Sequence, residues 1–192
     1  MAYSVELYFD PETEKRIKRL WAVLSERGIP ALDSSIYSRP HISLAVFDEV
    51  APEQLADVLF DIARNTPPIE VGLSSVASFP GRGGVLFLAP TASKELLRLH
   101  DELHIRLRTA DLKSDSYYLP GQWVPHCTIA TNLTNPVLKA AFEVARQSDV
   151  FGQGRLTSIG LVRFPPVQER AVYPLQGVAW SRAVGGPPAD RS

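Results

Sequence analysis

The sequence is poor in cysteine and in excess charge of either sign. Its 192 residues include one cysteine, Cys127, so no intramolecular disulfide can form, which fits a reducing compartment. Lys and Arg together number 20 and Asp and Glu 21, giving a formal net charge of −1. This balance argues against a strongly basic protein that binds nucleic acid irrespective of sequence, although a small pocket could still grip a single phosphate.

Long apolar runs are also missing. No run approaches the roughly 18–20 residues that cross a bilayer. The first residues, MAYSVEL, lack the basic and apolar regions of a secretory signal. We therefore expect a soluble, cytoplasmic protein that does not bind membranes.

What is present is an ordinary globular composition, with 45% hydrophobic and 21% charged residues. Hydrophobic periodicity predicts alternating strands and helices. Asp10 followed by Pro11 is typical of a capped helix start, and Gly28 of that helix's end. Further helices are expected over 52–65, 91–110 and 136–147, and strands over 4–9, 41–47, 69–79, 85–89, 123–131, 156–164 and 171–180.

Several segments repeat along the chain at one spacing. RPHISLA at 39–45 aligns with VPHCTIA at 124–130, and the two histidines are 126 − 41 = 85 residues apart. The Phe-Pro pairs that begin at positions 79 and 164 have the same offset, 164 − 79 = 85. VEL at 5–7 aligns with VLF at 85–87 at an offset of 80. These matches indicate an internal duplication.

The duplication predicts an α+β fold with two lobes, built around His41 and His126. We expect two antiparallel-type sheets related by a pseudo-twofold axis, with helices on the outside and a central cleft. Residues 1–182 should form this single bilobal domain. Residues 183–192, which include GGPP, have little to bury and are predicted to be a disordered tail.

The two Pro-His-x-Ser/Thr segments place polar side chains on one face of each predicted strand. Because side chains alternate along a strand, His41 and Ser43 point the same way, while Ile42 points to the opposite, apolar side. His126 and Thr128 share a face in the same manner. If the lobes meet across a pseudo-twofold axis, two imidazoles and two hydroxyls converge on one cleft.

Two histidines and two hydroxyls suit displacement at a phosphodiester. Histidine titrates near pH ~6.5, so at neutral pH one ring can act as a base and the other as an acid. One imidazole would take a proton from water or an alcohol, and the other would protonate the leaving oxygen. The hydroxyls can donate hydrogen bonds to the non-bridging phosphate oxygens.

These motifs resemble the paired His-x-Thr/Ser signatures of the 2H phosphoesterase superfamily, which includes bacterial 2′-5′ RNA ligases and 2′,3′-cyclic phosphodiesterases. The resemblance implies that His41 and His126 are the acid–base pair and that Ser43 and Thr128 bind the phosphate. It also implies that no metal or other cofactor is needed. The acid and base roles are not assigned between His41 and His126, because the two repeats carry equivalent motifs.

Other residues near the motifs are candidates for substrate binding. Arg39 could add positive charge beside the phosphate, although an exposed arginine is more often simply solvated. Tyr37 and Trp123 lie in the segments that lead into the motif strands and could stack on a base, although loop aromatics pack onto their own domain at least as often.

A second pair of histidines, His100 and His104, has helical i, i+4 spacing that would suit a metal. No third ligand is apparent, and the pair borders a leucine stripe, so we favour a structural place at the edge of an amphipathic helix.

The sequence therefore predicts a metal-independent phosphoesterase, acting as a monomer. Its partner would be an RNA terminus or a small nucleotide with a 2′,3′-cyclic phosphate, and the reverse transfer would be a 2′-5′ ligation. The alternative is a non-catalytic module that binds a nucleotide or RNA end in the same cleft.

Overall fold

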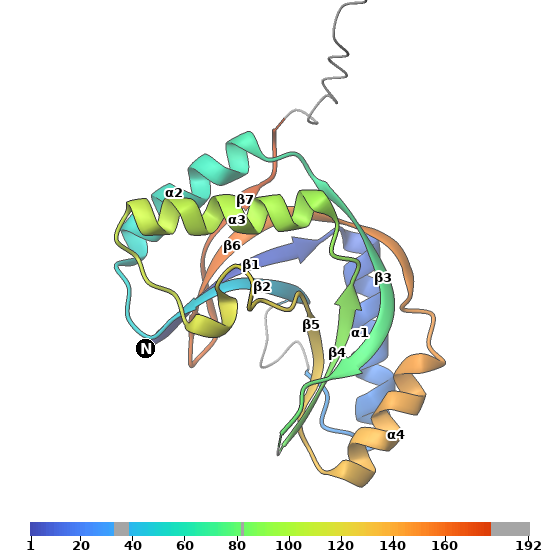
Figure 1. Cartoon of the computed structure of the whole chain (residues 1–192). Helices are drawn as coiled ribbons and strands as arrows, with labels where there is room; N and C mark the ends of the chain where they lie inside the picture. The colour runs from blue at the N-terminus through green and yellow to red at the C-terminus, as the bar shows by residue number, and fades with distance from the viewer. Residues whose placement is uncertain (33–38, 82, 178–192) are drawn as a thin grey trace, which may run out of the picture.

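A computed structural model describes residues 1–32, 39–81 and 83–177 of the chain (Figure 1). The elements follow the predicted alternation. They are β1 (Ala2–Phe9), α1 (Pro11–Glu26), β2 (His41–Phe47), α2 (Pro52–Asn65), β3 (Ile69–Ser78), β4 (Gly84–Pro90), α3 (Lys94–Thr109), the short 3-10 helix η1 (Ser116–Tyr118), β5 (Cys127–Leu133), α4 (Asn135–Arg146), β6 (Gly152–Phe164) and β7 (Gln168–Pro174).

The strands form one antiparallel sheet in the order β2-β1-β6-β3-β4-β5, with β7 also paired to β6. The α+β class and the antiparallel pairing are confirmed. The expectation of two sheets needs correction, because β3 pairs with β6 from Ile69 opposite Leu156 to Leu73 opposite Gly152. This pairing joins the two halves into a single, strongly curved sheet (Figure 1).

Strand register shows the internal duplication more sharply than the sequence does. Ser43 of β2 lies opposite Glu6 of β1, and Thr128 of β5 lies opposite Phe87 of β4. The register shifts at the same place in both pairs, just before Glu6 and just before Phe87. The first strands of the repeats therefore correspond at 87 − 6 = 81 residues rather than at the expected 80. A one-residue slip exchanges the two faces of a strand, so this difference decides which side chains face the site.

Helices cover the two halves of the sheet in pairs (Figure 1). α2 and α3 contact each other, and α2 packs on β6 and β7. α1 and α4 form the other pair, in which α4 packs on β3 and β4 and α1 contacts β5, β6 and β1. The Asp10 carboxylate caps α1, accepting hydrogen bonds from the backbone N–H groups of Glu12 and Thr13 at 3.0 Å. The apolar face of α1 is buried and comprises Ile17, Leu20, Trp21 and Leu24. Each repeat therefore contributes one helix to each helix pair.

The two motif strands lie at opposite ends of the strand order and yet contact each other. The connections leading into them cross over. Ahead of β2, the Leu32 N–H donates to the Ile129 carbonyl of β5 at 2.9 Å. Ahead of β5, the Asp115 N–H donates to the Val46 carbonyl of β2 at 2.7 Å. These crossed bonds cover parts of both sheet edges and hold the motif strands near each other.

Some predicted boundaries differ from those of the structure. The strand expected over 123–131 runs from Cys127 to Leu133, because the backbone N–H of Trp123 bonds to the Leu119 carbonyl rather than to a neighbouring strand. The last strand, expected over 171–180, runs from Gln168 to Pro174. Positions 178–180 and the predicted tail at 183–192 lie outside the described residues.

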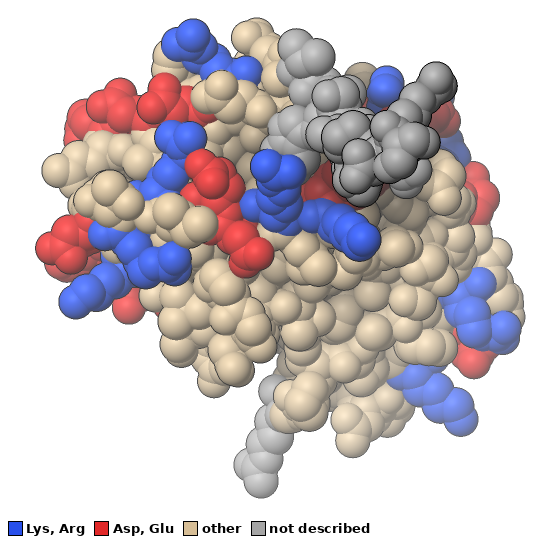
Figure 2. Space-filling view, turned by 45° about the horizontal axis from the view of Figure 1, so that its top comes forward, with Lys and Arg blue, Asp and Glu red and all other residues tan. Residues whose placement is uncertain are grey.

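Surface charge is mixed on the face shown in Figure 2, where acidic and basic side chains are interspersed. This distribution agrees with the near-neutral balance of the sequence. Within the described ranges, no helix is both long and apolar enough to cross a membrane.

We predict that Gly160→Ala destabilises the fold. The Tyr8 ring lies across Gly160, and an added Cβ would come within 2.5 Å of Tyr8 Cε2. Overpacking of this kind costs roughly 1–3 kcal/mol, which urea unfolding followed by circular dichroism would measure. Gly72→Ala is the control, because its Cβ would meet only side-chain ends, the nearest at 3.2 Å. Equal losses in both variants would contradict the close packing of Tyr8 on β6.

Candidate active site

The two motif histidines occupy matching positions. His41 is the first residue of β2, and His126 immediately precedes β5. Burial lowers the pKa of His126, its hydrogen bond to Val124 raises it, and the charge of His41 lowers it further. The contact between β2 and β5 brings the two motifs to one site, close enough for the charge of His41 to act on His126.

Both imidazoles are held by the same hydrogen bond. Nδ1 of His41 lies 2.8 Å from the carbonyl oxygen of Arg39, and Nδ1 of His126 lies 2.7 Å from that of Val124. A carbonyl oxygen only accepts, so each Nδ1 must carry the proton and donate it. In both neutral rings Nε2 is then the nitrogen that can accept or release a proton. This is the arrangement that general acid–base catalysis requires.

The surroundings of the two rings are not alike. Beside His41 lies Glu6, whose Oε2 is 3.5 Å from His41 Nδ1. His126 instead meets the edges of two aromatic rings, Phe79 at 4.9 Å and Phe87 at 5.4 Å between centroids. His41 therefore has a carboxylate as its neighbour, whereas His126 has two phenyl rings.

Glu6 was not among the residues predicted for the site. Burial raises its pKa, against the charge of His41, which lowers it. The signal that could have found it is a lone acidic residue in the apolar run of β1, AYSVELYF. The alignment at an offset of 80 concealed it, because that offset pairs Glu6 with Leu86, a fully buried core residue on the opposite face of the strand, instead of with Phe87.

The predicted phosphate ligands, Ser43 and Thr128, lie two residues after the histidines on their strands and are half-buried. Ser43 Oγ is 3.4 Å from Ser4 Oγ on the neighbouring strand. Cys127 points to the other side of β5 and is fully buried, and this burial raises the pKa of its thiol to about 12. The cysteine is therefore a protonated core residue.

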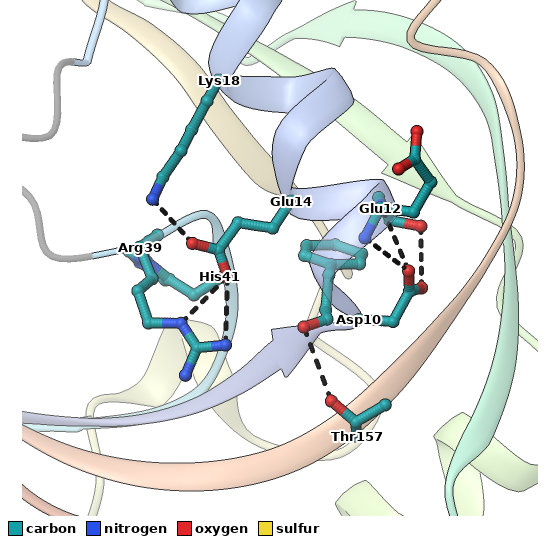
Figure 3. A network of polar contacts seen from close by, with 9 residues as sticks. Asp10, Glu12, Glu14, Lys18, Arg39, His41 and Thr157 are labelled. Carbon is teal, nitrogen blue, oxygen red and sulfur yellow. Dashed lines mark hydrogen bonds and ion pairs between the residues drawn. The ribbon is translucent and has the colours of Figure 1, made fainter.

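Arg39 lies in a network of charges beside the first motif (Figure 3). Its guanidinium contacts Glu14 Oε2 of α1 at 3.1 Å through Nε and at 3.0 Å through Nη2, and Lys18 binds the other oxygen of Glu14 at 2.6 Å. The guanidinium also lies 4.4 Å from the centre of the Tyr8 ring. The structure thus fixes Arg39 between α1 and β1. Tyr37, the other candidate of this connection, lies outside the described residues.

Trp123 supports the first motif from the second repeat. Its indole N–H donates to the Ser43 carbonyl at 2.9 Å, and one face of its ring stacks on His100 at 4.0 Å with an interplanar angle of 6°. The indole N–H and this ring face therefore make intramolecular contacts, and only the opposite ring face could stack on a nucleotide base.

The second histidine pair lies deeper than its expected place at a helix edge, since His100 and His104 are each only 2% exposed. Each Nε2–H donates to a backbone carbonyl, that of Tyr118 at 2.9 Å and that of Leu44 at 3.2 Å. The pair ties α3 to β2 and to the segment before β5. Nowhere in the described part of the chain do three His, Cys, Asp or Glu side chains gather as a metal site would need.

Comparisons with known proteins agree with this geometry. A family model for the 2′-5′ RNA ligase superfamily matches residues 9–165. A protein of Geobacillus kaustophilus, provisionally named a phosphoesterase, is 29% identical over 147 residues, covering 74% of each chain. Its similarly named counterpart in Geobacillus thermodenitrificans is 27% identical over the same length and shares.

Solved structures show the same fold at low sequence identity. A Thermus thermophilus protein has a TM-score of 0.66 at 17% identity, covering 92% of this chain and 99% of its own. Escherichia coli LigT, solved with NADP+, has a TM-score of 0.60 at 14% identity, covering 90% of this chain and 96% of its own. LigT has also been solved with 3′-AMP, ATP and phosphate.

We predict that the buried His100 makes stability depend on pH. Burial and the neighbouring His104 lower the pKa of His100 to about 4 in the folded state, against about 6.5 in the unfolded chain. As pH falls from 6.5 to 4, only the unfolded chain takes up this proton, so the free energy of unfolding decreases, by on the order of 3 kcal/mol.

Urea unfolding at pH 7, 6, 5 and 4 would measure this dependence. His100→Phe keeps a ring against Trp123 but removes the titrating group, so its free energy of unfolding should fall less over the same range. An identical pH dependence in the two proteins would contradict a neutral, buried His100.

Proposed function

Because the chain belongs to the 2′-5′ RNA ligase superfamily, a group of 2H phosphoesterases, we propose that it hydrolyses 2′,3′-cyclic phosphodiesters of RNA ends or small nucleotides. Family membership supports a phosphoesterase or RNA ligase-like enzyme in general. The observation that carries the narrower proposal is the pair of imidazoles, each with Nδ1–H bonded to a backbone carbonyl and Nε2 available for proton exchange.

In the proposed reaction a water oxygen attacks phosphorus, and the bond from phosphorus to the 3′ oxygen breaks. The base takes one proton from the water and the acid gives one proton to the leaving oxygen, so the products are a 2′-phosphate and a 3′-hydroxyl. Hydroxyls of Ser43 and Thr128 donate hydrogen bonds to the non-bridging oxygens as charge builds on them. An alcohol in place of water would form a 2′-5′ linkage by the same steps.

The unequal surroundings favour one assignment of roles. His126, edged by Phe79 and Phe87, has a lowered pKa and is neutral at pH 7, as a base must be. His41 then protonates the leaving oxygen. Complexes of LigT with 3′-AMP and ATP support a nucleotide as the substrate class. Trp123 is best placed to support the first motif through Ser43 rather than to stack on a nucleotide base. Arg39, bound to Glu14, is best placed to position the motif rather than to contact the phosphate.

We predict turnover of a 2′,3′-cyclic phosphate oligonucleotide in the presence of EDTA. His41→Ala and His126→Ala should each lower kcat by about 10²–10⁴-fold, the usual contribution of a general acid or base. Glu102→Ala, on the exposed side of α3, is the control and should match the wild type. Turnover that EDTA abolishes, or that survives both histidine substitutions, would contradict the proposal. Binding without any hydrolysis between pH 5 and 9 would favour the non-catalytic module.

The pH dependence of kcat/KM should be bell-shaped, with two apparent values that belong to the coupled pair. The rate rises as the base loses its proton and falls as the acid loses its own. Phe79→Ala lets water reach the His126 imidazolium, which raises the pKa of this ring and moves the low-pH limb to higher pH. A rate that increases steadily through pH 9, or a low-pH limb unmoved by Phe79→Ala, would be inconsistent with these roles.

A further inference from the structure

Glu6 is the one residue among Asp, Glu, Lys and Arg in the described ranges whose side chain is buried in the core, at 5% exposure. We propose that Glu6 is a positioning residue for His41, holding the ring from its Nδ1 side and stabilising the imidazolium that donates the proton. This inference rests on the proposed function, because it assigns a partner to the general acid of that reaction.

Strand geometry places the carboxylate behind the ring. Glu6 lies directly opposite Ser43 on β2, and its neighbour on the same face of β1, Tyr8, lies opposite His41. Glu6 Oε2 is 3.5 Å from His41 Nδ1, while the Nδ1–H itself donates to the Arg39 carbonyl at 2.8 Å. The carboxylate therefore acts on the ring through its charge, from the side away from Nε2.

A buried carboxylate is expensive unless a cation or hydrogen-bond donors compensate it. The groups that face Glu6 are His41 from β2, Ser4 and Tyr8 from β1, and Glu169 from β7. His41 is the group among them that can carry a positive charge. The Ser4 hydroxyl lies 3.4 Å from Ser43 Oγ, and the buried Tyr8 hydroxyl has no partner within hydrogen-bond distance among the described residues. Glu169 is a second negative charge, which raises the pKa of Glu6 and so adds to the cost of its ionised form.

The second repeat shows what the carboxylate adds. Phe87 occupies on β4 the place that Glu6 occupies on β1, each opposite the hydroxyl residue of its motif. The Phe87 ring lies 5.4 Å from the His126 ring and offers no charge. The two repeats share the strand register and the Nδ1 hydrogen bond. In the proposed mechanism, Glu6 is therefore what suits His41 to donate a proton, and Phe87 in its place is what suits His126 to accept one.

Proton accounting is consistent with this role. The His41 imidazolium carries protons on Nδ1 and Nε2, and it releases the Nε2 proton to the leaving oxygen. The ring is left neutral with Nδ1–H still bonded to Arg39, while His126 has gained the proton of the attacking water. Exchange of both rings with solvent restores the starting state, and Glu6 neither gains nor loses a proton.

The experiment is Glu6→Gln, which keeps the shape of the side chain and removes its charge. With the cyclic-phosphate substrate, kcat/KM should fall by about tenfold or more, and the high-pH limb of the profile should move to lower pH because the imidazolium loses its counter-charge. Glu70→Gln, which removes a carboxylate from an exposed ion pair with Arg155, should leave both limbs in place. A Glu6→Gln profile identical to the wild type would overturn the inference.

A double-mutant cycle separates action through His41 from a general effect on structure. Glu6→Gln in the His41→Ala background should cause no further loss of activity, whereas a full additional loss would overturn the positioning role.

NMR on the wild-type protein covers the case in which Glu6→Gln does not fold. The His41 imidazole resonances should shift as Glu6 titrates, and resonances that do not shift would contradict the pairing. If the wild-type protein shows this coupling between Glu6 and His41 but does not turn over the substrate, the proposed function is refuted and the pairing of Glu6 with His41 is not.

Discussion

The antiparallel pairing of β3 with β6 is the interaction on which the rest of the structure depends. Each of these strands leaves its own repeat and pairs with the other, so that one curved sheet contains both copies. The curvature brings β2 and β5, the two ends of the strand order, into contact. Crossed backbone hydrogen bonds from Leu32 and Asp115 then hold these ends. The site is thus a consequence of how the duplicated sheet closes.

Within this symmetric frame the surroundings of the two histidines are asymmetric. Duplication supplies two histidines held alike through Nδ1, which by itself would give two groups with similar proton affinity. Acid–base catalysis needs the two to differ, and pairs of titratable groups in contrasting environments are how proteins achieve this. In the proposed mechanism the cross-strand neighbour, Glu6 in one repeat and Phe87 in the other, contributes to this contrast, together with Phe79 beside His126.

Much of this arrangement could be predicted from the sequence, because strand alternation and a repeated motif are local signals. Because side chains alternate along a strand, the sequence predicted that His41 and Ser43 share a face of β2. The residue type of Asp10 predicted that it caps α1. The joining of two sheets into one, and the pairing of Glu6 with His41, depend on register across distant strands, which no local pattern encodes. The burial of His100 likewise follows from the stacked Trp123, 23 residues further along the chain.

The central claim is that imidazoles from the two repeats act on one phosphorus atom. The most direct test follows the imidazole resonances of His41 and His126 by NMR, assigned with the two alanine variants, while adenosine 2′-monophosphate is added. The account predicts that both rings shift along a single saturation curve with one dissociation constant. A response of only one ring, or of neither, at saturating nucleotide would contradict it.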